Sequence, residues 1–450
     1  MFRFPRIESV FPLCIPKRHN LQQKTYSCTI FFTATTSDPN SGAWTDETDH
    51  ALLILLVLHH NGKTLSPNDL AGRLKIWVYQ GLRALDRPTT WLWENGWLSK
   101  RSVNSVPMII SAHNLKVVLD KEYLTDPAAT AYRHWVDSGR KIAPNGSLMR
   151  THPLGIVCLG FSLDQTCRVA TAFSAITHAD PRCTLACCIS TGLIRGILRG
   201  EILGKSDVDD VIECVYQWVD TWAKCRRADW GNLKSNKRRE FEDGELLDRQ
   251  EFNKHVQAQI FEELQLDDSM KIGYVYKCLG AAILSLRMGM RQAPYDAAAT
   301  TVTAALPYPT IFENIITELT LAAGDADTNA CAAGALGGCW LGYGALPSHW
   351  RDGMRDINWL VQKCNGLIQV LEVSSEPKLK YRGRDDPDTH PDGGKGLMSK
   401  EEREERDRNF MMKHMEKQEK GVEQEKNRLE KERKQKQRLW GGMLGQLIGQ

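Results

Sequence analysis

The sequence predicts an all-α protein with one large helical domain, a disordered linker and a charged C-terminal helix. Between residues 42 and 370, apolar residues recur mostly at helical spacing, and stretches that alternate like a strand are few. After Ser374 the composition shifts to Pro, Gly, Asp and Lys, and later to Glu, Lys, Arg and Gln. We therefore divide the chain into an irregular N-terminal segment, the helical domain, the linker and the charged tail, at residues 1–41, 42–370, 371–398 and 399–450.

The helices of the domain follow from apolar periodicity. We expect a core helix over residues 51–60, which begins after Thr48 or Asp49 as its N-cap. The next helix carries Leu70, Leu74 and Trp77 at helical spacing. Further helices are expected at 128–137, 166–177, 182–199, 207–226, 251–264, 272–289, 295–306, 310–322 and 329–342. Their number and the absence of a repeat favour one all-α domain.

The tail pattern predicts an exposed helix. Pairs such as Glu416 and Lys420 stand four residues apart, which stabilises a solvated helix. Met415, Val422 and Leu429 recur every seven residues, but the complementary seam is polar, so a single helix is favoured over a coiled coil. A partner protein that binds this helix is one interpretation of the tail, and a solubilising arm is the other.

Composition excludes several classes of protein. The net charge is only +3, so we expect no nucleic-acid binding, and the longest apolar run, residues 51–58, is too short to span a membrane. The 13 cysteines are scattered without a CxxC pair, which favours buried free thiols over disulfides or a zinc site. We therefore expect an intracellular, cytoplasmic protein, with a mitochondrial location as the alternative.

Two acidic clusters are the candidate functional residues. Residues 45–49 read T-D-E-T-D and residues 325–328 read D-A-D-T, and each cluster precedes a helix of apolar or small residues. Carboxylate and hydroxyl oxygens are ligands that Mg²⁺ prefers. Either cluster alone is better explained as helix caps or as charges that complement the helix dipole than as metal ligands. A metal site requires the fold to bring the two together.

Four segments in order along the chain resemble the ADP-ribosylglycohydrolase family. Residues 44–49 (W-T-D-E-T-D) resemble its W-T-D-D-T-D segment, and residues 145–155 contain a version of its G-x-x-M-R…P-L-G loop. Residues 174–181 resemble its S-x-x-T-H-x-x-P segment, and residues 324–335 its G-D-x-D-T-N…A-G-A segment. Together they cover most of the helical domain, so the match is specific.

The resemblance implies a fold, an activity and a cofactor. It implies an all-α orthogonal bundle that hydrolyses the N- or O-glycosidic bond between ADP-ribose and a modified side chain, using two Mg²⁺ ions. ADP-ribosylated proteins, or small molecules that contain ADP-ribose, would be the substrates. Thr45, Asp46 and Glu47 would bind metal from one side, and Asp325, Asp327 and Thr328 from the other. Asp46, Glu47 and Asp325 would be catalytic.

The resemblance also implies a nucleotide pocket. Gly146 and Ser147 would bring backbone N–H groups to the diphosphate, because glycine permits close approach, and Asn145 would bind the ligand beside them. Met149 would line the pocket, and His178 would hydrogen-bond ribose or phosphate, unless it is a structural histidine. Arg150 has two interpretations, a ligand contact or an ion pair with a buried acid.

The sequence departs from the family pattern at three points. Glu47 stands where the family usually has Asp, and Ala323 where a second Gly is common. No segment before Trp44 matches the family's G-D-A-x-G helix and its acid. Either part of the site is lost, or a wrong gene-prediction junction replaced the true exon, and the aperiodic composition favours the second. If the site is incomplete, the alternative function is an ADP-ribose-binding or nucleotide-binding module without catalysis.

Overall fold

The fold is described from a computed structural model of the chain. It describes residues 44–62, 64–88, 116–229, 247–296, 301–302, 307–371, 383–409 and scattered positions between 412 and 430. The irregular segment expected at 1–41 lies outside these residues. The chain divides into two compact units, Met1–Lys395 and Gly396–Gln450.

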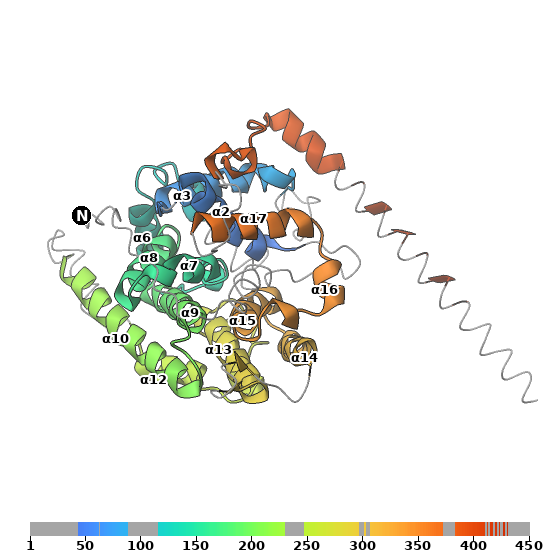
Figure 1. Cartoon of the computed structure of the whole chain (residues 1–450). Coiled ribbons are helices and arrows are strands. Elements are labelled where there is room, and N and C mark those ends of the chain that lie inside the picture. The colour runs from blue at the N-terminus through green and yellow to red at the C-terminus, as the bar shows by residue number, and fades with distance from the viewer. Residues whose placement is uncertain are drawn as a thin grey trace, which may run out of the picture. The chain divides into compact units, whose positions relative to one another are not determined.

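The first unit is built from α-helices, which confirms the all-α fold class (Figure 1). The helices before the centre of the chain are α2 (Asp46–Asn61), α3 (Pro67–Gln80), α6 (Pro127–Asp137), α7 (His152–Val157), α8 (Leu163–Ala175), α9 (Pro181–Arg199) and α10 (Lys205–Asp229). Those that follow are α12 (Arg249–Val256), α13 (Val275–Gln292), α14 (Tyr308–Leu321), α15 (Ala326–Leu341), α16 (Ser348–Asp352) and α17 (Ile357–Val370). Short 3₁₀ turns connect them.

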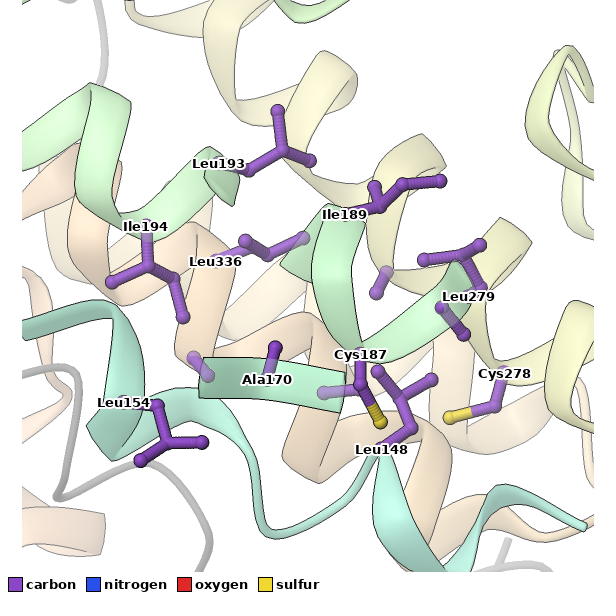
Figure 2. Close-up of a cluster of buried hydrophobic side chains, with 14 of the residues drawn as sticks. Leu148, Leu154, Ala170, Cys187, Ile189, Leu193, Ile194, Cys278, Leu279 and Leu336 are labelled. Carbon is purple, nitrogen blue, oxygen red and sulfur yellow. The ribbon is translucent and has the colours of Figure 1, made fainter. Parts of the chain in front are cut away.

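Helices α9, α13 and α15 pack against one another in the core. Helix α15 consists largely of Ala, Gly and Cys, so its backbone approaches its neighbours closely. Figure 2 shows Leu193 and Ile194 of α9 with Leu336 of α15 in one buried apolar cluster. Close approach also requires glycine at Gly155 of α7, where an added Cβ would lie 2.5 Å from the Ile194 side chain. Packing of α15 in this core fixes the position of the helix's N-terminus.

Two expectations about elements are wrong. The helix expected at 295–306 is replaced in the described residues by a hairpin, with β1 (Tyr295–Asp296) antiparallel to β2 (Thr301–Val302). Pro294 and the β-branched Thr301 and Val302 oppose helix there. The helix expected at 251–264 ends with α12 and continues after a break as a 3₁₀ turn, η6 (Phe261–Leu264).

Part of the expected linker is folded instead of disordered. Residues 383–395, which we call the strap, form the turns η8 (Gly383–Asp385) and η9 (Pro387–Thr389) and belong to the first unit. The strap packs on α2, as does α17 (Figure 1). Its Thr389 is fully buried. Composition misled here because Asp386 and Asp388 of the strap pair with the buried Lys363 of the domain instead of with water. Residues 372–382 lie outside the described part.

The second unit begins the charged tail. Residues 400–409 are helical, as expected for this segment, and Met415 is exposed. Val422 and Leu429 lie outside the described residues, so the choice between a single helix and a coiled coil stays a prediction. Among the described residues of both units, no helix is long and apolar enough to cross a membrane. The described cysteines are all free, and all but Cys214 and Cys225 are buried.

Candidate active site

The first acidic cluster lies at the N-terminus of α2. The helix begins at Asp46 with Thr45 as the N-cap position, three to four residues before the cap that the sequence predicts. The Thr45 side chain makes no capping hydrogen bond. Because the cluster is inside the first turn, Asp46 is partly exposed, whereas Glu47 is 3% exposed. The carboxylates near this end are stabilised by the helix dipole, but they do not cap the helix.

Asp49, the third acid of this cluster, has a structural role. Its carboxylate accepts hydrogen bonds from the indole N–H groups of Trp44, at 2.8 Å, and Trp77, at 3.0 Å. Arg87 donates to the carbonyl oxygen of Trp44 at 2.9 Å and lies over its ring. These contacts anchor the residue before the cluster and so set the position of Asp46 and Glu47. The carboxylate of Asp49 is therefore occupied by hydrogen bonds within the fold.

The second acidic cluster lies at the N-terminus of α15. The turn before it places two successive residues in the left-handed region, Ala323 with φ of 63° and Gly324 with φ of 74°. Asp325 occupies the N-cap position but makes no side-chain capping bond. Asp327 accepts a hydrogen bond only locally, from the backbone N–H of Thr328 at 2.9 Å. The interpretation of these acids as simple caps is therefore not supported at Asp325.

The two clusters meet. The Thr328 hydroxyl donates a hydrogen bond of 2.8 Å to Oε1 of Glu47, across 281 residues of sequence. Asp46, Asp325 and Asp327 are close enough to raise the pKa of the Glu47 carboxyl through charge repulsion. Two helix N-termini thus bring their carboxylates and hydroxyls to one place, as a shared metal site would require.

The loop at residues 145–150 borders this acidic pair. Asn145 lies in η2 (Asn145–Ser147), and its Nδ2 donates to Oδ2 of Asp325 at 2.6 Å. Gly146 is buried beside it. The Ser147 hydroxyl instead faces the core, where it accepts hydrogen bonds from Ser174 at 3.0 Å and Cys187 at 3.3 Å. Only Asn145 of these three has a side-chain contact with the acids.

The remaining pocket candidates are buried next to the loop. The Met149 carbonyl oxygen accepts from the thiol of Cys331 in α15 at 3.2 Å, which ties the loop to the second cluster. His178 is 1% exposed and its Nδ1 lies 2.8 Å from the hydroxyl of Thr177. Arg150 donates to that hydroxyl at 2.7 Å and to the carbonyl oxygen of Phe173 at 3.2 Å.

The ion pair that was one interpretation of Arg150 is not formed. Among the described residues no carboxylate bonds its guanidinium, and burial lowers its pKa. Sequence reasoning missed two residues here, Thr177 and His50. His50 follows Asp46 by one helical turn, a spacing that could have identified it. Neither of its ring nitrogens has a hydrogen-bond partner among the described residues, and burial lowers its pKa to about 3.

Burial and mutual repulsion dominate the electrostatics of the acids. Burial first, then the charges of Asp46 and Asp327, raise the pKa of Glu47 well above its ordinary value. The pKa of Asp325 is likewise raised, by desolvation and then by Asp327, although part of the residue is exposed. Carboxylates held together in this way favour a bound cation or protons.

The donor set fits Mg²⁺ by its chemistry. Glu47 Oε2, Thr45 Oγ1 and Asn145 Oδ1 are buried oxygens without a hydrogen-bond partner in the described part of the chain. The neighbouring thiols of Cys278 and Cys331 donate hydrogen bonds to backbone carbonyls, and burial raises their pKa, so they stay protonated and only oxygens remain as ligands. Within the described residues, no three His, Cys, Asp or Glu side chains already stand at metal-ligand spacing. Mg²⁺ keeps several waters and needs only one or two carboxylates.

Comparison with known proteins points to one family. A family model described as ADP-ribosylglycohydrolase matches residues 6–377, which includes most of the segment before Trp44. A solved structure described as an ADP-ribosylglycohydrolase-related protein complex aligns with 78% of this chain and 99% of its own, at 18% identity and a TM-score of 0.42. No curated protein matches at a significant level.

Proposed function

The chain belongs to the ADP-ribosylglycohydrolase family, and from this premise we propose that it is a Mg²⁺-dependent hydrolase that removes ADP-ribose from modified protein side chains. The observation that carries the proposal is the hydrogen bond from Thr328 to Glu47, which joins the two acidic clusters. Two helix ends far apart in the sequence meet there without capping themselves, and the buried oxygens left without a partner among the described residues are of the kind that a hard cation binds.

Six residues would hold the metal. Thr45, Asp46 and Glu47 would bind from α2, and Asp325, Asp327 and Thr328 from α15, by their oxygen atoms. Two Mg²⁺ ions, when bound, would supply Lewis acidity toward a ribose hydroxyl and toward the charge that develops at the anomeric carbon. The convergence of these side chains and the raised pKa of Glu47 and Asp325 support this assignment.

Asp46, Glu47 and Asp325 would carry the hydrolysis. The oxygen of a water molecule forms a bond to the anomeric carbon of the distal ribose, and the bond from that carbon to the side-chain nitrogen or oxygen breaks. One of these carboxylates accepts the proton that the water loses, and the leaving group takes up a proton. Glu47 suits proton exchange because burial and its acidic neighbours raise its pKa.

The loop and the histidine would bind the nucleotide. Gly146 and Ser147 would face the diphosphate with backbone N–H groups. Asn145 would border the ligand beside them, with its side chain held against Asp325 and its own backbone N–H already bonded to the carbonyl oxygen of Gly273. Met149 would line the pocket and His178 would hydrogen-bond ribose or phosphate. The cytoplasmic location and a partner for the charged tail stay predictions of the sequence.

The test is release of ADP-ribose. Peptides ADP-ribosylated on arginine or serine are incubated with the full chain in Mg²⁺ and, separately, in EDTA. We expect free ADP-ribose in Mg²⁺ only. Asp46→Ala and Asp325→Ala should each abolish release while the far-UV circular dichroism stays that of a helical protein.

Two other outcomes would redirect the proposal. Release that persists in either variant contradicts the metal assignment. Binding of ADP-ribose without release from either linkage would favour the alternative of a binding module, in which Glu47 in place of the family's Asp has cost the activity.

A further inference from the structure

Arg150, Thr177 and His178 form a series of hydrogen bonds that links two connecting segments of the fold. Arg150 lies between η2 and α7, and the other two lie in the turn between α8 and α9. The Arg150 Nη2 donates to Thr177 Oγ1 at 2.7 Å, and the same oxygen lies 2.8 Å from His178 Nδ1. All three residues are at most 1% exposed. Water therefore does not compete for these bonds.

Donor and acceptor roles along this series leave one arrangement of hydrogens. A guanidinium only donates, so Thr177 Oγ1 is an acceptor toward Arg150. The threonine hydroxyl carries one hydrogen, and in this buried position that hydrogen needs an acceptor of its own. His178 Nδ1 is that acceptor, provided that this nitrogen carries no proton. The proton of the neutral imidazole must then be on Nε2.

We infer that Arg150, acting through Thr177, holds His178 in the neutral Nε2–H tautomer, so that the ring presents a hydrogen-bond donor to an anionic oxygen of the ligand. Under the proposed function, on which this last step rests, that oxygen belongs to the diphosphate of ADP-ribose. Arg150 and Thr177 are then positioning residues. This role accounts for a buried arginine that no carboxylate bonds among the described residues, an arrangement that is costly for stability alone.

The tautomer can be read directly in the full-length protein. The twelve histidines are labelled with ¹⁵N, and the His178 signals are assigned as those lost in His178→Gln. Long-range ¹H–¹⁵N spectra distinguish a protonated Nε2 from a protonated Nδ1. We expect His178 to be in the Nε2–H form without any ligand. An Nδ1–H form, or a doubly protonated ring at pH 7, overturns the inference, and this measurement needs no variant that must fold.

Thr177 offers a matched pair of variants. Thr177→Val keeps the shape but removes the hydroxyl, and we expect it to lose the single tautomer and to bind ADP-ribose about tenfold more weakly, or ~1.4 kcal/mol. Thr177→Ser restores the hydroxyl and should restore both the tautomer and the affinity to within about twofold. If Thr177→Val lowers the melting temperature but keeps the Nε2–H tautomer, the hydrogen bonds of Arg150 and Thr177 are structural only and the inference is wrong.

Failure of the tautomer assignment and failure of the proposed function give different experimental results. If the wild-type protein shows the Nε2–H tautomer but binds no ADP-ribose by calorimetry, the proposed function fails while the tautomer assignment of His178 stands. If the wild-type protein binds ADP-ribose with His178 in the Nδ1–H form, the tautomer assignment fails and the proposed function stands.

Discussion

At the scale of single residues, the acids of the candidate site are held against their own repulsion. Asp325 faces Asp327, and Glu47 faces both of them and Asp46. Each negative charge raises the free energy of ionising its neighbour. Residues kept in such an arrangement reduce the stability of the metal-free protein, which is typical of a functional site.

The first prediction concerns Asp325→Asn. The amide keeps an oxygen for the hydrogen bond from Asn145 but removes one charge. Without Mg²⁺ we expect the free energy of unfolding to rise by on the order of 1 kcal/mol, while hydrolysis is lost. Urea unfolding in EDTA measures the first effect and release of ADP-ribose the second.

Mg²⁺ supplies the control for this variant. A ligand at 100 times its dissociation constant stabilises the folded state by about 2.7 kcal/mol, so the wild type should gain in that range and Asp325→Asn much less. Equal stabilisation of both proteins by Mg²⁺ would mean that Asp325 is not a ligand.

The second prediction concerns the turn before α15. Ala323 has a φ of 63°, which costs an L-residue about 1–2 kcal/mol relative to right-handed backbone. Ala323→Gly removes this strain but adds entropy to the unfolded chain, so we expect the free energy of unfolding to rise by up to about 1 kcal/mol. Thermal and urea unfolding measure it.

Gly324→Ala is the matched opposite. An added Cβ there would lie 2.2 Å from the carbonyl oxygen of Leu266, with φ already at 74°, so this variant should be strongly destabilised. If Ala323→Gly is destabilising as well, the left-handed conformation at Ala323 is not present in solution.

At the scale of elements, the strap stabilises the end of α2 that is remote from the acids. Lys363 of α17, 1% exposed, pairs with Asp386 and, at 2.8 Å, with Asp388. Its carbonyl oxygen contacts the imidazole of His59 near the end of α2 at 2.8 Å. Arg73 of α3 donates to the Thr389 carbonyl oxygen at 2.7 Å. Lys363 therefore depends on the strap for its carboxylate partners, whereas Arg73 also pairs with Asp69 of its own helix at 3.1 Å.

The third prediction removes both carboxylates with Asp386→Ala and Asp388→Ala together. An uncompensated buried charge costs about 3–5 kcal/mol, so we expect a loss of that size in the free energy of unfolding, measured by urea denaturation. The exposed pair of Lys224 and Asp220 provides the control, because Lys224→Ala should change stability by less than about 1 kcal/mol. Equal effects of the two changes would contradict a docked strap.

Elements differ in how well the sequence predicts them. Helices such as α9 and α13 are close to their predicted bounds, because long apolar periodicity reports burial directly. The predictions for the segment after Pro294 and for the strap are wrong because they rest on local composition. Local composition describes the conformation that a segment prefers in water, whereas the buried Lys363 and the neighbouring helices decide the conformation in the fold.

At the scale of the whole molecule, buried histidines make stability depend on pH. Burial lowers the pKa of His50 and His152 to about 3, and that of His59 to about 4, from an ordinary value near 6.5. Below pH 6.5 the unfolded chain binds protons that the folded chain does not. Each histidine therefore lowers the free energy of unfolding as the pH falls, by up to about 1.4 kcal/mol per pH unit, down to its folded pKa.

The fourth prediction isolates one of them with His152→Asn. The amide can still donate to the Met149 carbonyl oxygen, which His152 Nδ1 contacts at 3.2 Å, but it does not titrate. We expect the slope of unfolding free energy against pH, between pH 6.5 and 5, to fall by up to about 1.4 kcal/mol per unit relative to the wild type. Urea unfolding across that range measures it.

Only the difference in pH slope between the wild type and His152→Asn is informative. Glu47 and Asp325 have raised pKa values, so the folded state binds their protons first and gains stability as the pH falls. This contribution opposes that of the histidines and is common to both proteins. An unchanged slope in His152→Asn would mean that His152 is already protonated or exposed when folded.

The sequence alone determined the helical class and proposed the candidate site residues other than Thr177 and His50, because apolar periodicity and short motifs are local properties that survive without neighbours. It could not determine whether Glu47 and Thr328 meet, since 281 residues separate them and each cluster is also an acceptable helix start. Packing of α15 against α9 and α13 decided that. Tertiary packing also buried the pair of Arg150 and Thr177, and the packing of α17 and the strap on α2 gave Lys363 its partners. Burial turns a modest polar preference into a requirement for a specific partner.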